Sequence, residues 1–382
     1  MTQNLKEFAD LYRRQGPWCT VFVDAGTGTV DSLAAADVRP QNVRAQLESG
    51  GAGREDVDAV EAALQRATGQ PSPVAQFILA RQGTVEISEV LPGVRAQPEQ
   101  VSVGPVPDLT PLARSRPESF PYVVAEVGRG DAEVRLHYAS SDPRAAAEEV
   151  EEVQGSTENL SKFPGGGWAQ YGYQHRTEEV WRKNADEVAA AIDRLATDSR
   201  ARMIVLAGDV RARSMVQDQL SKAGQALVEH VESHTHTGGD NPEDLRDRVS
   251  SLVAEKWATG QQEILDRLAM QEGQDNPESA TGPGAVVSAL QQAQVDVLIF
   301  DADALSGRTF LALGAEPWIA AAEGESLGAE VLGKVAGPAA LLRAAALTDA
   351  GVLLVPGAAL PDGVDVAALL RWPTGPGVPA SS

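Results

Sequence analysis

The sequence predicts a mixed α/β and α+β fold divided into three domains. The chain has 382 residues, enough for two or three domains of roughly 100–150 residues each. Short apolar runs typical of strands alternate with segments whose apolar residues recur every three or four positions, as in helices. Stretches rich in proline or glycine, at 97–117 and 273–277, separate these elements into three groups.

The first predicted domain covers residues 1–115. Its expected elements are a buried strand at 20–23, helices at 41–47 and 56–67, and strands at 74–80 and 84–90. Arg81-Gln82-Gly83 joins the last two strands, and its glycine suits a hairpin turn. The five prolines between 97 and 117 are interpreted as marking the domain boundary.

The second predicted domain, residues 118–272, contains the most distinctive segment. Two strands, 122–127 and 133–138, precede an acidic stretch at 148–161 and a glycine-rich loop at 161–170. A helix is expected at 173–195, because its apolar residues form one stripe: Trp181, Ala185, Val188, Ile192 and Leu195. The remaining elements are a strand at 203–207, a helix at 210–220, a strand at 226–231 and a helix at 242–270.

The third predicted domain, residues 278–373, is a compact α/β sandwich. Its expected elements are helices at 285–292 and 338–347, strands at 295–300 and 352–355, and a short strand at 318–320. The tail 374–382, rich in Pro, Gly and Ser, is predicted to be disordered.

Composition excludes several classes of function. No apolar run approaches the ~20 residues that a membrane-spanning helix needs, and no signal peptide is evident, so a cytoplasmic protein without membrane partners is expected. Cys19 is the single cysteine, which excludes an internal disulfide and a multi-cysteine zinc site and predicts a small buried side chain. A net charge of −22 argues against non-specific DNA binding. Between 161 and 213, however, the chain has nine basic and seven acidic residues, so this segment is mildly basic within an acidic protein.

The glycine-rich loop and the helix behind it provide the candidate binding residues. Three consecutive glycines can approach another surface closely, and aromatic and cationic side chains follow them, as in single-stranded RNA sites. The candidates are Lys162, Gly165, Gly166, Gly167, Trp168, Gln170, Tyr171, Tyr173, His175, Arg176, Arg182 and Lys183. The alternative is a plain helix-entry loop followed by a solvated face of mixed charge, diluted by Glu178 and Glu179.

The sequence from Gly165 to Ala185, Gly-Gly-Gly-Trp-Ala-Gln followed by a long Arg-containing helix, resembles the middle domain of archaeal and eukaryotic release factors. The sequence from Phe163 to Gln170 resembles the actinobacterial Balon-like branch of the release factor and Pelota superfamily, which contains ribosome hibernation factors. The resemblance implies a three-domain ribosome binder whose first domain lies near the decoding centre. It also implies a loop directed at the peptidyl transferase centre, and elongation factor Tu as a further partner.

One departure from the family pattern decides between two functions. A release factor places Gln directly after two glycines, whereas Trp168 and Ala169 separate Gly167 from Gln170 here. Catalysis is sensitive to shifts of ~1 Å, so we expect a hibernation factor that occupies the A site of the 70S ribosome without peptide release. The alternatives are a peptidyl-tRNA hydrolase or rescue factor using Gln170, and a binding module unrelated to ribosomes.

Three further groups of residues give weaker signals. His230, His234 and His236 lie close together, but no strict zinc spacing is met, so a solvent-exposed loop is expected. Asp24, Asp209 and Asp301 each follow an apolar strand in different predicted domains, and Asp209 is interpreted as a helix N-cap. The glycines at 50–53 lack the Lys and Ser or Thr of a P-loop. No metal or cofactor is expected.

Overall fold

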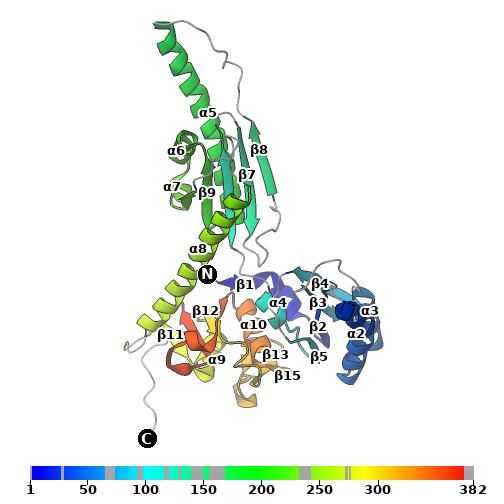
Figure 1. Cartoon of the computed structure of the whole chain (residues 1–382). Helices are drawn as coiled ribbons and strands as arrows, with labels where there is room; N and C mark the ends of the chain where they lie inside the picture. The colour runs from blue at the N-terminus through cyan, green and yellow to red at the C-terminus, as the bar shows by residue number, and fades with distance from the viewer. Residues whose placement is uncertain are drawn as a thin grey trace. The chain divides into compact units, whose positions relative to one another are not determined.

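The computed structural model describes residues 2–26, 30–64, 74–92, 98–115, 120–128, 131–138, 149–154, 168–231, 242–271, 274 and 277–373. The chain forms two compact units, one made of residues 1–118 and 259–382 and the other of residues 119–258. Each unit combines β-sheet with helices, which confirms the mixed α/β and α+β class (Figure 1). The division into three domains stays a prediction. Among the described residues, no helix is long and apolar enough to cross a membrane.

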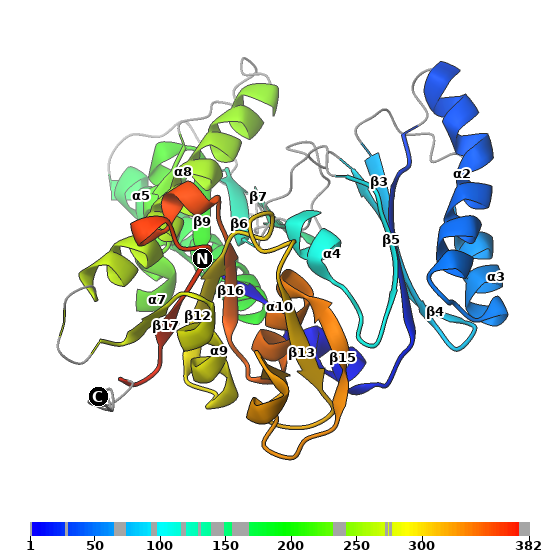
Figure 2. The same cartoon turned by 90° about the horizontal axis from the view of Figure 1, so that it is seen from below.

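The first unit contains a four-stranded antiparallel sheet in the order β4-β3-β2-β5. Its strands are β2 (Trp18–Asp24), β3 (Val74–Arg81), β4 (Thr84–Pro92) and β5 (Gln100–Gly104). Helices α2 (Val30–Ser49) and α3 (Arg54–Ala63) cover one face (Figure 2). Between β3 and β4, Gln82 and Gly83 both have positive φ, which confirms the predicted hairpin turn.

Alternate residues of β2 face two different cores, as the period of a strand requires. Cys19, Val21 and Val23 pack with residues of α2 and α3. Trp18 and Phe22, on the opposite face, belong to a larger core shared with residues 280–370. This shared core explains why the two ends of the chain form a single compact unit.

The rest of the first unit is an α/β arrangement around a five-stranded sheet in the order β1-β16-β12-β17-β11. The strands are β1 (Gln3–Asn4), β11 (Ser279–Thr281), β12 (Val295–Phe300), β16 (Gly351–Leu354) and β17 (Val366–Leu370). A second sheet contains β13 (Thr309–Leu313), β14 (Ile319–Ala320) and β15 (Val331–Ala336). The helices are α1 (Ala9–Arg13), α4 (Thr110–Ser115), α9 (Pro283–Gln291) and α10 (Gly337–Leu347).

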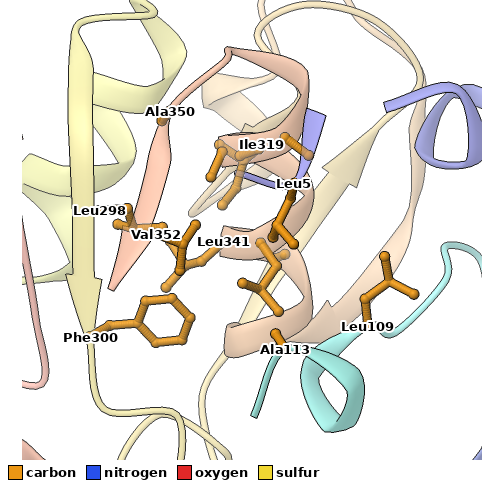
Figure 3. Close-up of a cluster of buried hydrophobic side chains, with 14 of the residues drawn as sticks. Leu5, Leu109, Ala113, Leu298, Phe300, Ile319, Leu341, Ala350 and Val352 are labelled. Carbon is orange, nitrogen blue, oxygen red and sulfur yellow. The ribbon is translucent and has the colours of Figure 1, made fainter. Parts of the chain in front are cut away.

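Figure 3 shows how residues far apart in sequence meet in this core. Leu5 and Leu109 lie with Leu341 of α10 and Val352 of β16, and all four side chains are buried. The first residues of the chain even form a strand in the C-terminal sheet, because β1 pairs antiparallel with β16. The N-terminal segment is therefore part of the C-terminal core.

The second unit has a five-stranded mixed sheet in the order β10-β9-β6-β7-β8. Its strands are β6 (Pro121–Val127), β7 (Asp131–Tyr138), β8 (Glu149–Gln154), β9 (Met203–Gly208) and β10 (Val228–His230). The helices are α5 (Trp168–Ser199), α6 (Val210–Gln219), α7 (Lys222–Gln225) and α8 (Pro242–Met270), of which α8 continues into the first unit. Figure 1 shows α5 running along the sheet and extending past its end.

Two stretches without a predicted helix or strand contain regular structure. The proline-containing stretch 97–117 holds β5, which pairs with β2, and the buried helix α4, and it ends next to the border between the two units. Prolines at 105, 107 and 111 lie outside the paired residues of β5 or in the first turn of α4, where a missing N–H costs little. The acidic stretch 148–161 includes β8, which pairs with β7 despite its glutamates.

Candidate functional site

The predicted binding residues fall into three groups in the structure. Lys162, Gly165, Gly166 and Gly167 lie outside the described residues. A second group lies on the first turns of α5, where the structure describes the course of the backbone: Trp168, Gln170, Tyr171, Tyr173, His175 and Arg176. Arg182 and Lys183 form the third group, and their side chains are exposed.

Helix α5 begins at Trp168, five residues earlier than predicted. Trp168 and Gln170, expected in the loop, are therefore helical. The sequence explains this correction, since Ala169 and Gln170 favour helix and the glycines that disfavour it end at Gly167. With 32 residues at 1.5 Å each, α5 is about 48 Å long.

Helical geometry distributes the candidate residues around α5. Trp168, His175 and Arg182 follow one another at intervals of seven residues, which places them along one side of the helix. Gln170 comes two residues after Trp168, a rotation of about 200° at 100° per residue. Trp168 and Gln170 thus lie on nearly opposite sides of the helix axis.

The C-terminal half of α5 anchors this helix to its unit. Four residues of the predicted stripe are buried against β6, β7 and β9: Ala185, Val188, Ile192 and Leu195. The side chain of Trp181, the fifth residue of that stripe, lies outside the described part of the chain. Arg182 and Lys183 are exposed immediately before Asn184 and Ala185 become buried. The predicted separation of a cationic face from an apolar stripe is confirmed for these residues.

A carboxylate fastens α5 to the short helix α7. The Asp193 Oδ2 atom accepts a hydrogen bond from the Ser221 backbone N–H at 2.8 Å, and its Oδ1 accepts from the Ser221 hydroxyl at 2.8 Å. Ser221 Oγ in turn caps α7 by accepting from Gly224 N–H at 3.0 Å. A Cβ on Gly224 would lie 2.4 Å from Asp193 Oδ1, so only glycine permits this contact.

Asp209, interpreted from the sequence as an N-cap, is the N-cap of α6. Its Oδ1 accepts from the backbone N–H groups of Arg211 and Ala212 at 3.0 and 3.1 Å. Asp24 and Asp301 serve similar turns in the first unit. Asp24 Oδ1 accepts from Gly26 N–H, whereas Asp301 accepts from the backbone of Asp303, Ala304 and Gly357. Each of these carboxylates holds a local turn or helix start in place.

The sheet face opposite α5 carries a polar cluster that the sequence did not reveal. Tyr122 and His137 stack with ring centroids 5.2 Å apart, and Arg135 bridges Glu126 and Glu133 at 2.8 and 2.6 Å. Burial, followed by the charges of Arg135 and Arg246, lowers the pKa of His137. Alternation along β6 and β7 indicates which residues share this face, but not that α8 would cover it.

A shallow groove of about 460 Å³ lies between β10 and α8, and it includes His230. His230 is exposed and hydrogen-bonds Gln217 Oε1 at 2.9 Å, whereas His234 and His236 lie outside the described residues. Within the described part of the chain, no group of three His, Cys, Asp or Glu side chains is placed to hold a metal ion. Cys19 is buried as predicted, and burial raises the pKa of its thiol to about 11.

Comparison with known protein families finds one match, which falls on the second unit. Residues 121–274 match bacterial archaeo-eukaryotic release factor family 2. The match begins at β6 and ends just after α8, so it covers the whole described sheet of this unit and α5. This part of the chain is therefore similar to that release factor family.

Two further comparisons extend over more of the chain. The uncharacterized protein Rv2629 of Mycobacterium tuberculosis is 25% identical over 303 residues, which cover 76% of each protein. Among solved structures, Archaeoglobus fulgidus Pelota is similar with 18% identity and a TM-score of 0.30, covering 78% of this chain and 79% of Pelota. Dom34 of Saccharomyces cerevisiae gives 10% identity and a TM-score of 0.40, covering 79% and 82%. These structural likenesses are distant.

Proposed function

We propose that this protein is a ribosome-binding factor of the hibernation type. It would occupy the A site of the 70S ribosome, contact ribosomal RNA there, and block decoding and peptidyl transfer without releasing the peptide. One observation carries the proposal: a unit that matches a release factor family presents a glycine-led helix about 48 Å long with exposed cations at Arg182 and Lys183.

The position of Gln170 supports binding over hydrolysis. A hydrolytic glutamine must hold water beside the scissile ester within a narrow geometric tolerance. Gln170 is separated from the glycines by two residues and lies in the first turn of α5, about 200° around the helix from Trp168. The two residues that separate the glycines from Gln170 are the reason we propose binding without peptide release.

Charge supports RNA contact at this helix. Arg182 and Lys183 are exposed, and the ion pair of Lys183 with Glu187 is long, at 3.9 Å, and solvated. The chain as a whole carries a charge of −22, which would repel RNA from other faces. We therefore propose an oriented contact through α5. The proposal also includes the division into three domains and elongation factor Tu as a further partner.

Co-sedimentation with purified 70S ribosomes tests the proposal. We expect the wild-type protein to pellet with ribosomes, and R182E/K183E to bind about tenfold more weakly because two phosphate-facing charges are reversed. The matched control R202E/K222E makes the same charge change at two exposed residues elsewhere in the unit and should bind normally. Equal losses in both variants, or no pelleting of the wild type, would contradict the proposal.

A release assay separates binding from the alternative activity. Ribosomes carrying peptidyl-tRNA are incubated with wild type and Q170A, and the freed peptide is measured. We expect no release above background from either protein. Release by wild type that is lost in Q170A would instead establish a peptidyl-tRNA hydrolase that uses Gln170.

A further inference from the structure

Helix α5 changes at residue 184 both in its packing and in its charge. Just before this residue, Arg182 and Lys183 are exposed, and from this residue onward one side of the helix is buried against its own sheet. We propose that the RNA contact of α5 ends at this border, and that the carboxylates of Asp186 and Glu187 are the groups that limit it. This limit rests on the proposed contact between α5 and ribosomal RNA.

Packing sets the border first. Asn184 and Ala185 are 8% and 6% exposed, and Ala185 and Val188 belong to the core that α5 forms with the sheet. Residues 168–183, the projecting segment, are about 24 Å long at 1.5 Å per residue. Figure 1 shows the helix extending past the end of the sheet. Only the projecting segment can enter a narrow cavity lined by RNA, because the rest of α5 is packed against the sheet.

Charge sets the same border independently, on the exposed side of the helix. The projecting segment contains three Arg or Lys and two Glu, whereas the rest of α5 contains four acids and one Arg. Asp186 and Glu187 are the first two of these acids, and both are exposed. They follow Arg182 and Lys183 by four residues, which places each acid one turn further along the same side of the helix. An RNA strand that follows this side therefore meets two cations and then two carboxylates.

The contact between Glu187 and Lys183 shows how close the two charge types lie. Glu187 Oε1 is 3.9 Å from Lys183 Nζ, and the side chains are 48% and 74% exposed. An ion pair this exposed contributes little to stability. Its carboxylate instead lowers the positive potential around Lys183, which weakens the attraction of phosphates beyond that residue. Phosphates are thus attracted at Arg182 and repelled from Asp186 onward, so the two carboxylates limit how far RNA extends along α5.

The salt dependence of RNA binding tests this border. The probe is a fluorescein-labelled oligouridylate of about 20 nucleotides, and its anisotropy is measured with the full-length protein between about 50 and 200 mM salt. D186K/E187K should bind about tenfold more tightly than wild type at the lower salt concentration. Its slope of log K against log salt should steepen by about 1.4, because two further phosphates are neutralised at about 0.7 each. D186N/E187Q only removes repulsion and should bind about threefold more tightly than wild type.

The matched control D198K/D218K makes the same charge change at two exposed acids of the same unit that lie beyond the border. Its salt slope should equal that of wild type. Equal steepening in D198K/D218K and D186K/E187K would show attraction to the total charge of the unit and overturn the inference. An unchanged slope in D186K/E187K, or no binding of the oligouridylate by any of these proteins, would overturn it too. Ribosome pelleting of the wild type tests the proposed function separately, so a protein that pellets but gives equal slopes contradicts the border alone.

Discussion

Gly208 closes the connection between β9 and α6 and cannot be replaced without a clash. Its φ is 101°, and a Cβ there would lie 2.3 Å from the carbonyl oxygen of Val127. We predict that G208A destabilises the second unit by about 3 kcal/mol. Urea denaturation followed by tryptophan fluorescence measures this change. Gly51 has a similar φ of 85° with nothing within 4 Å, so G51A should cost only about 1 kcal/mol.

Arg343 is a buried cation used to satisfy main-chain carbonyls. It is 1% exposed and donates to Tyr12 O, Trp318 O and Leu313 O at 3.2, 2.9 and 2.8 Å. Burial lowers the pKa of its guanidinium to about 10, so the ion remains charged at neutral pH. These bonds join α1, α10 and the turn before β14.

We predict that R343M destabilises the first unit by about 3 kcal/mol, since three main-chain carbonyls lose the guanidinium donor, two of them in buried contacts. The chain offers a matched control in Arg371, which is exposed and also donates to three carbonyls: Ala293 O, Thr348 O and Asp349 O. R371M should cost under about 1 kcal/mol, because water replaces the lost bonds. Thermal unfolding measures both changes in stability. Equal losses of stability in R343M and R371M would contradict the claim that burial makes the Arg343 hydrogen bonds more stabilising.

His137 makes the stability of the second unit depend on pH. Burial, aided by Arg135 and Arg246, lowers its pKa in the folded state relative to about 6.5 when unfolded. As pH falls through 6.5 the unfolded chain takes up a proton that the folded chain does not, so stability falls. We predict that H137F, which keeps a ring against Tyr122, loses less stability between pH 7 and 5 than wild type. Urea unfolding of both proteins at pH 7 and pH 5 measures the difference, and an equal loss in H137F and wild type would contradict this role of His137.

At the scale of single elements, α5 depends on its clamp to α7. We predict that D193A destabilises the second unit by about 1.5 kcal/mol, because two hydrogen bonds to Ser221 are lost. D186A removes an exposed acid from the same helix and should change stability by less than about 0.5 kcal/mol. Chemical denaturation compares the two, and a D193A protein as stable as D186A would contradict the clamp.

Elements with their own local pattern were predictable from the sequence. The strands β2, β3, β9 and β12 are apolar runs, and α5, α6, α8 and α10 carry helical stripes, so each was placed within a few residues. The strands that were missed depend on partners distant in the sequence. The two residues of β1 pair with β16, and β8 is rich in glutamate, while β17 (Val-Ala-Ala-Leu-Leu) has no strand-specific alternation.

The candidate site was predictable in part for a similar reason. The spacing of Arg182 and Lys183 relative to Ala185 and Val188 already indicates exposed and buried faces, which the structure confirms. The start of α5 was misplaced, because glycine-rich sequence obscures where helix propensity begins. The Tyr122–His137 stack joins residues from separate strands. No local pattern encodes such a contact.

At the scale of the whole molecule, the two units differ in charge and architecture. The second unit presents exposed cations on a projecting helix within a release factor family match. The first unit joins both ends of the chain through one core and contains a pocket whose charged lining is Glu99, Asp108, Asp303 and Arg114. We propose that the second unit contacts ribosomal RNA.

An electron cryo-microscopy map of the protein bound to 70S ribosomes tests this account most directly. It predicts density in the A site, with the N-terminal end of α5 directed at the peptidyl transferase centre and Arg182 and Lys183 against ribosomal RNA. Density at another ribosomal surface, or an A site that stays empty at saturating protein, would contradict it.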